Sequence, residues 1–136
     1  MRVIYTADGI ESLTGLNWST AIEITSPDAF HSIDPVTVAD DRRSQGGQPF
    51  ARVRWSGWRG ELIWTVLTQA ERDQLFAWWQ TTAGWRRPFA LEDDDGARYL
   101  ATMPTEQFPL AYVGGQPAAY SMTNPVTLTA TERTAP

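Results

Sequence analysis

GELIWTVLTQAERDQLFAWWQTTAGWRRPF, residues 60–89, decides the fold, because it carries strand, helix and strand signals in one uninterrupted run. Residues 61–67 alternate in polarity with a period of two, and they are rich in β-branched and aromatic side chains, which predicts a strand with one buried face. The residues expected on that face are Leu62, Trp64 and Val66. Thr68 and Glu71 have the spacing of a capping box, so a helix should begin directly after this strand.

The helix is expected over residues 69–82, where apolar residues recur at helical spacing and form one buried face. Gly84 can adopt the left-handed conformation that ends a helix, and Arg86 and Arg87 suit the negative end of the helix dipole. Pro88 prevents the helix from resuming. The predicted core residues of the whole stretch are Trp64, Leu75, Phe76, Trp78, Trp79, Trp85 and Phe89.

Outside this stretch the chain reads as short strands joined by turns. An Asp-Gly turn predicts a hairpin between residues 89–91 and 98–103. Further strands are expected at 2–6, 16–25, 50–55, 105–113 and 118–132, with a turn at 56–60, whereas 29–38 fits either an extended segment or a loop. About seven or eight strands with one helix predict a mainly β single domain, a two-layer β-sandwich or flattened barrel with the helix at an end or edge.

Residues 39–49, ADDRRSQGGQP, are charged and Gly-rich and have no apolar periodicity. We interpret this segment as a long mobile loop. Loops of that length in compact domains are usually functional or disordered.

Composition excludes several classes of function. The 136 residues contain no Cys, which rules out disulfides, thiolate zinc sites and a cysteine nucleophile. All 11 basic residues are Arg, and 16 acidic residues give a net charge of −5, which disfavours a nucleic-acid binder. There is no apolar run of signal-peptide or membrane-span length, so we expect no membrane insertion and a protein made and kept in the cytosol.

The sequence signals for a catalytic or a metal site are weak. His31 is the single histidine, so a triad would have to combine it with Ser26, Ser32 or Ser44 and an acid such as Asp34, and no nucleophile-elbow pattern surrounds these serines. The acidic run 92–95 lacks calcium-loop spacing and is better interpreted as a solvated hairpin tip. A pair of catalytic carboxylates, as in glycoside hydrolases, remains an open alternative, because the two residues need to be close in space but not in sequence. We expect no enzyme activity, metal or cofactor.

The tryptophans offer a second class of function, a sugar-stacking platform. Most of them fall on predicted buried faces, so core packing is the simpler interpretation. Trp58, in the expected turn, is the best exposed candidate, and Tyr112 could be a second. A small β-sandwich carbohydrate-binding module is therefore the alternative function. The six tryptophans considered are Trp55, Trp58, Trp64, Trp78, Trp79 and Trp85.

The order of elements from residue 50 onward resembles the minor tail proteins of long-tailed bacteriophages, in particular the lambda-type minor tail protein M and related distal tail proteins. The resemblance rests on a strand, a Thr-capped helix, a Gly-Trp stop, an aromatic strand start and a closing Thr-rich strand. The matching positions are Trp64 to Thr68, Glu71 to Trp79, Gly84, Trp85, Phe89 and Val126 to Glu132.

The resemblance implies a tail-tube-like β-sandwich in a non-enzymatic virion protein, made in the host cytoplasm. Such proteins form a ring, expected to be a homo-hexamer, at the distal tail tip. The ring joins the tail tube to the hub proteins and lets DNA pass through its lumen without specific binding. An acidic chain without Lys agrees with such a lumen. The residues expected at subunit contacts are Asp40, Asp41, Arg42, Arg43, Arg86 and Arg87.

Overall fold

The computed structural model describes residues 1–43 and 49–136, without the side chains of residues 29–32, 38–43 and 49–55. Its elements are β1 (Arg2–Ile4), the short 3-10 helix η1 (Trp18–Thr20), β2 (Ile22–Glu23), β3 (Ala29–Arg43), β4 (Pro49–Ile63), β5 (Leu67–Thr68), α1 (Gln69–Thr81), β6 (Phe89–Glu92), β7 (Arg98–Thr102), β8 (Leu110–Gly114), β9 (Ala119–Met122) and β10 (Val126–Thr134).

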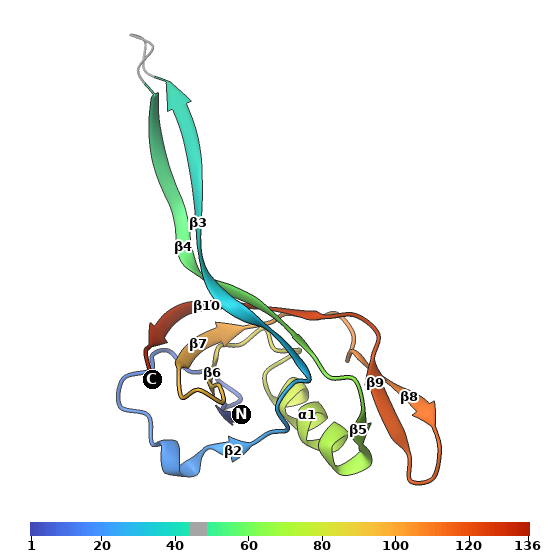
Figure 1. Ribbon diagram of the computed structural model, residues 1–136. Coiled ribbons are helices and arrows are strands. Elements are labelled where there is room, and N and C mark those ends of the chain that lie inside the picture. Colours follow the sequence, from blue (N-terminus) through green and yellow to red (C-terminus); the bar gives the residue numbers. More distant parts are fainter. Residues whose placement is uncertain (44–48) are drawn as a thin grey trace.

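The strands form two antiparallel sheets packed together. The larger has the order β2-β1-β6-β7-β10-β4-β3, and the smaller has the order β5-β9-β8. Figure 1 shows α1 beneath the larger sheet and beside the smaller one, while β3 and β4 rise together out of this body. The prediction of a mainly β, sandwich-like fold with one helix is therefore confirmed.

Helix α1 begins and ends where the sequence indicates. The Thr68 hydroxyl accepts the Glu71 amide at 3.3 Å, and the Glu71 carboxylate accepts the Thr68 amide at 3.0 Å, which completes the capping box. After the helix, Ala83, Gly84 and Trp85 all have positive φ, at 54°, 74° and 58°. The Gly84 amide donates to the Trp79 carbonyl at 2.8 Å, so this left-handed segment closes the last turn.

The core lies between the sheets and α1. Trp78 meets Trp85 and Phe89 edge to face, with ring centroids 5.3 Å and 4.7 Å apart. Of the predicted core residues, Phe76 and Trp79 are only partly buried and pack around Phe108. The other five are fully buried: Trp64, Leu75, Trp78, Trp85 and Phe89.

Several predicted boundaries are wrong. The strand expected at 61–67 ends at Ile63 and resumes only as β5, so Val66 is 70% exposed instead of buried. The segment expected at 16–25 contains η1 and only a two-residue strand. The strand expected at 105–113 begins at Leu110. The segment at 29–38, left open between loop and strand, belongs to β3.

The largest correction concerns residues 39–60. The expected turn at 56–60 is absent, because β4 runs unbroken from Pro49 to Ile63. The expected mobile loop at 39–49 is also wrong where the structure describes it, since residues 39–43 belong to β3 and Pro49 begins β4. Residues 44–48 lie outside the described residues. Two 15-residue strands thus replace a predicted loop, strand and turn.

Candidate functional site

The long β3–β4 hairpin is the main feature that projects from the body (Figure 1). β10 pairs with β4 only from Trp58 to Leu62, so β4 pairs with β3 alone from the Val36–Gly57 pair outward to the Arg43–Pro49 pair. We call this two-stranded part, residues 36–43 and 49–57, the arm. At about 3.3 Å per residue, the arm extends roughly 20 Å beyond the point where β10 stops pairing with β4.

Four of the predicted subunit-contact residues lie on the arm. Asp40 stands opposite Arg52 in the register, Asp41 opposite Ala51, and Arg42 opposite Phe50. These positions belong to a regular antiparallel ladder. A ladder fixes the backbone position of each residue along the arm, which an irregular loop would not do.

Arg86 and Arg87, the other two predicted contact residues, lie on the body, after α1. Both are exposed, and both bond to carbonyl oxygens of their own chain. Arg86 donates to the Thr105 carbonyl at 3.4 Å, and the Arg87 guanidinium donates to the Ala7 carbonyl. The structure therefore does not bring these two arginines together with the arm.

Two carboxylates of the acidic turn between β6 and β7 accept hydrogen bonds from other groups of the same chain. One oxygen of Asp93 accepts the Asp95 and Ala97 amides at 3.0 and 2.9 Å. Asp94 accepts the Met1 ammonium at 2.9 Å and the Ser26 hydroxyl at 2.7 Å. The first of these hydrogen bonds, supported by the second, lowers the pKa of Asp94 below its ordinary value.

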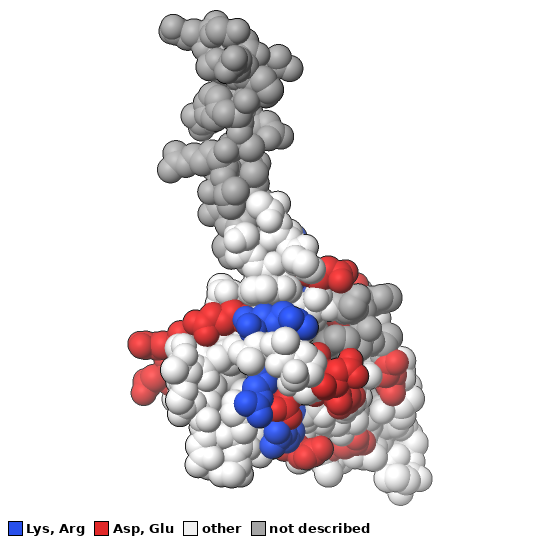
Figure 2. Space-filling view, turned by 60° about the vertical axis from the view of Figure 1, so that its left-hand side comes forward, with Lys and Arg blue, Asp and Glu red and all other residues white. Residues whose placement is uncertain are grey.

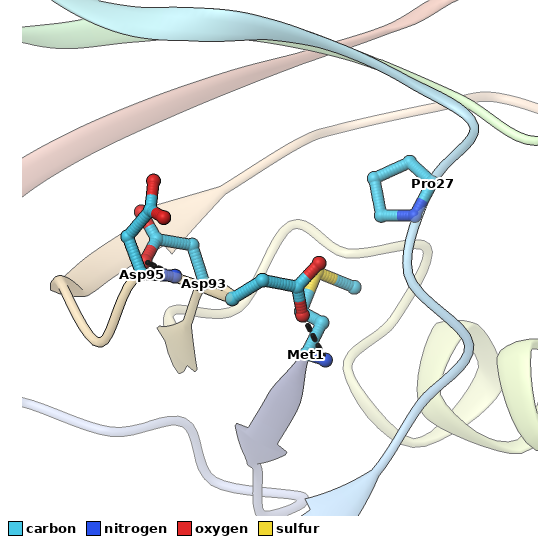
Figure 3. Close-up of a pocket in the computed structure, with 5 residues that line it drawn as sticks. Met1, Pro27, Asp93 and Asp95 are labelled. Atoms are coloured by element: carbon cyan, nitrogen blue, oxygen red, sulfur yellow. Dashed lines mark hydrogen bonds and ion pairs between the residues drawn. The ribbon is translucent and has the colours of Figure 1, made fainter.

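Figure 3 shows the pocket beside this turn, about 280 Å³ in volume, with Met1 and Pro27 on one side and Asp93 and Asp95 on the other. The Asp93 carboxylate bonds within the turn, and the Asp94 carboxylate bonds to the N-terminus. Across the part of the chain that the structure describes, no group of three or more Asp, Glu and His residues could hold a metal ion.

A second carboxylate, Glu92 at the end of β6, bonds to both neighbouring strands, β1 and β7. It accepts Arg2 at 2.5 Å and Arg98 at 2.8 Å. The two guanidinium groups also lie over the Trp18 ring, 5.9 and 4.4 Å from its centroid. Partial burial, the largest single effect, favours the neutral acid, but the hydrogen bonds and charges of Arg98 and Arg2 together lower the pKa of Glu92. Figure 2 shows one face of the body, on which basic residues gather in the middle with acidic residues around them.

The residues considered for a catalytic triad, where the structure describes them, lie on strands or bond within the chain. Ser26 bonds to Asp94 and to the Met1 ammonium. His31 and Asp34 lie on β3, opposite Glu61 and Arg59 of β4. The side chains of His31 and Ser32, and the whole of Ser44, lie outside the described residues. The structure thus provides no assembled triad among the side chains it describes.

The aromatic candidates separate into two kinds. Trp58 is in β4, not in a turn, and packs partly buried against the core. Trp64, Trp78 and Trp85 are core residues with no exposed surface, and the side chain of Trp55 lies outside the described set. Tyr112 on β8 is 62% exposed and meets Tyr120 edge to face, with centroids 5.8 Å apart.

One cluster was missed by sequence reasoning. The Arg72 guanidinium lies over three rings, at 4.7 Å from the centroid of Phe76, 5.2 Å from Phe108 and 5.6 Å from Tyr120. Tyr120 in turn donates to Gln69 at 2.5 Å, which ties the smaller sheet to α1. Only Arg72 and Phe76, at i and i+4 on the helix, gave a sequence signal for this cluster.

Comparison with known proteins adds no family to these observations: no protein-family model, no curated protein and no solved structure matches the chain. Within the described residues, no helix is long and apolar enough to cross a membrane.

Proposed function

We propose that the chain is a non-enzymatic structural protein of a bacteriophage tail, which forms a homo-hexameric ring at the distal tip and joins the tail tube to the hub. The single observation that carries this proposal is the arm. An antiparallel two-stranded projection of roughly 20 Å is suited to reach a neighbouring subunit.

The smaller sheet offers a second surface that supports assembly. β8 is its edge strand, and Tyr112 and Val113 on that strand are 62% and 66% exposed. An exposed edge strand with apolar side chains is a template for pairing with another chain. In a ring, this edge can add backbone pairing to the contact that the arm makes with a neighbouring subunit.

The charge of the chain agrees with a tail lumen. A net charge of −5 without any Lys gives little affinity for the DNA backbone, so DNA would pass without being retained. The proposed localisation follows from the same role: synthesis in the host cytoplasm and incorporation into the virion tail.

Negative-stain electron microscopy of the purified chain, with light scattering for its mass, tests the proposal. A closed ring with a central hole wide enough for a DNA duplex is expected. Particles without a ring, at every protein concentration and in the presence of tail tube and hub proteins, would exclude this role.

A carbohydrate-binding module is the second candidate, and the exposed Tyr112 favours it, because sugar rings stack on exposed aromatic faces. Trp58, the partner once expected for Tyr112, is partly buried against the core. A glycan array separates the two candidates. Saccharide binding that Tyr112→Ala abolishes would support the module, whereas a tail protein should bind no saccharide on the array.

A further inference from the structure

The arm has too little structure of its own to be stable without a partner. A two-stranded hairpin alone is marginally stable in water, and stable sheets have three or more strands or a packed layer. Within the described residues, the strands of the arm pair only with each other, beyond the Trp58–Ala130 pair that ties β4 to β10. Figure 1 shows the two strands of the arm rising away from the other labelled strands and from α1.

Charge distribution indicates what covers the arm. Residues 38–55 contain four Arg and two Asp, a net charge of +2. Since the whole chain carries −5, the remaining residues carry −7. Figure 2 shows acidic side chains on several parts of the body surface. The arm and the body are thus of opposite charge, and attraction between them favours association of one copy with another.

We propose that the arm of one copy docks on the acidic body of a second copy. This inference rests on the proposed assembly role and specifies its interface as heterologous, because arm and body are different surfaces. Each copy donates one arm and accepts one arm, which is the arrangement that closes into a ring. Pairing between two arms is the competing arrangement, and it would give a two-fold dimer.

Two variants test this contact. The first, a trimmed chain, replaces residues 38–55 by Asn-Gly, a dipeptide suited to a two-residue hairpin turn. It joins Thr37 to Ser56, which face each other in the register, and it keeps the entire β4–β10 pairing. The second carries Arg42→Glu and Arg43→Glu and keeps the arm. Arg42→Lys with Arg43→Lys is the matched control, because it alters the same two side chains and keeps the charge of the arm.

The expected result is that arm reversal weakens self-association roughly tenfold or more, while the charge-conserving Lys control weakens it far less. Raising the salt concentration should weaken the wild-type contact, because salt screens exposed charges. The readout is mass by light scattering across a dilution series. Circular dichroism and thermal unfolding check that each variant is folded.

Mixing trimmed and wild-type chains distinguishes the two arrangements. A trimmed copy can still accept an arm but cannot donate one. It should therefore enter wild-type assemblies, prevent the ring from closing and lower the mass of the assembly. Trimmed chains that never bind wild type would indicate arm-to-arm pairing and overturn the inference. Rings that persist in the trimmed or reversed variants would overturn it too, but would leave the proposed ring function standing. A wild-type chain that stays monomeric under all conditions would contradict both.

Discussion

At the scale of single residues, Glu92 is a polar side chain on which the contact between neighbouring strands depends. Its carboxylate holds Arg2 of β1 and Arg98 of β7, and its side chain is only 13% exposed. Removing the charge leaves two guanidinium groups without their anion, and breaking partly buried, charge-assisted hydrogen bonds is costly.

Glu92→Gln should therefore lower the free energy of unfolding by about 2 kcal/mol at neutral pH, measured by urea denaturation. Because the pKa of Glu92 is lowered in the folded state, its stabilisation is present above the ordinary Glu pKa of about 4.3 and is lost as pH falls through the folded value. The difference between variant and wild type should shrink over that acidic range. A difference independent of pH would contradict the charge-based explanation. Asp95→Asn, at an exposed carboxylate, is the control and should change stability little.

Residue-scale contacts also explain part of what the sequence could not predict. Arg2 and Glu92 are 90 positions apart, and no local pattern links them. The same holds for Asp94, whose partner is the Met1 ammonium 93 positions away. The acidic run was correctly interpreted as a hairpin tip, because the Asp-Gly signal is local, yet the partners of Glu92 and Asp94 include residues far away in the sequence.

At the scale of elements, α1 was predicted almost to the residue, because its signals are local. Thr68 and Glu71 are three positions apart, and each bonds to the other's amide. Residues 50–55 of β4 were predicted as a strand, but the rest of the hairpin was missed in part, because residues 40–43 of β3 are all charged and Gly57 and Gly60 suggested a turn within β4. Their strand structure depends on backbone pairing between residues as far apart as Ala29 and Ile63.

Thr68→Ala tests the capping box. It removes the acceptor of the Glu71 amide, so we expect a loss of about 1 kcal/mol in the free energy of unfolding. Gln74→Ala, at an exposed position inside the helix, should have an effect below about 0.5 kcal/mol. Equal losses in the two variants would mean that the cap contributes nothing specific.

The left-handed segment after α1 gives a pair of opposite substitutions. A Cβ on Gly84 would lie 3.0 Å from the Thr105 carbonyl oxygen, and φ there is +74°, so Gly84→Ala should cost about 1 to 2 kcal/mol. Ala83 already has a left-handed φ of 54°, and Ala83→Gly should stabilise by about 0.5 kcal/mol. Urea denaturation of both variants checks the prediction, and effects of the same sign would refute it.

At the scale of the whole molecule, the mainly β architecture followed from the number of strand signals and the single capped helix. Its most prominent feature, the arm, could not be predicted in this way. A hairpin that projects from the body makes no core contacts, so nothing imposes an apolar pattern on its sequence. The predicted contact residues Asp40 to Arg43 fall on the arm, although the segment was expected to be a loop.

Copy number is the measurement that tests the assembly account most directly. Native mass spectrometry of the purified chain, over a series of concentrations, should show a closed hexamer that dissociates as salt is raised, because the proposed contact joins opposite charges. A monomer at every concentration, or a ladder of masses with no preferred copy number, would contradict the ring.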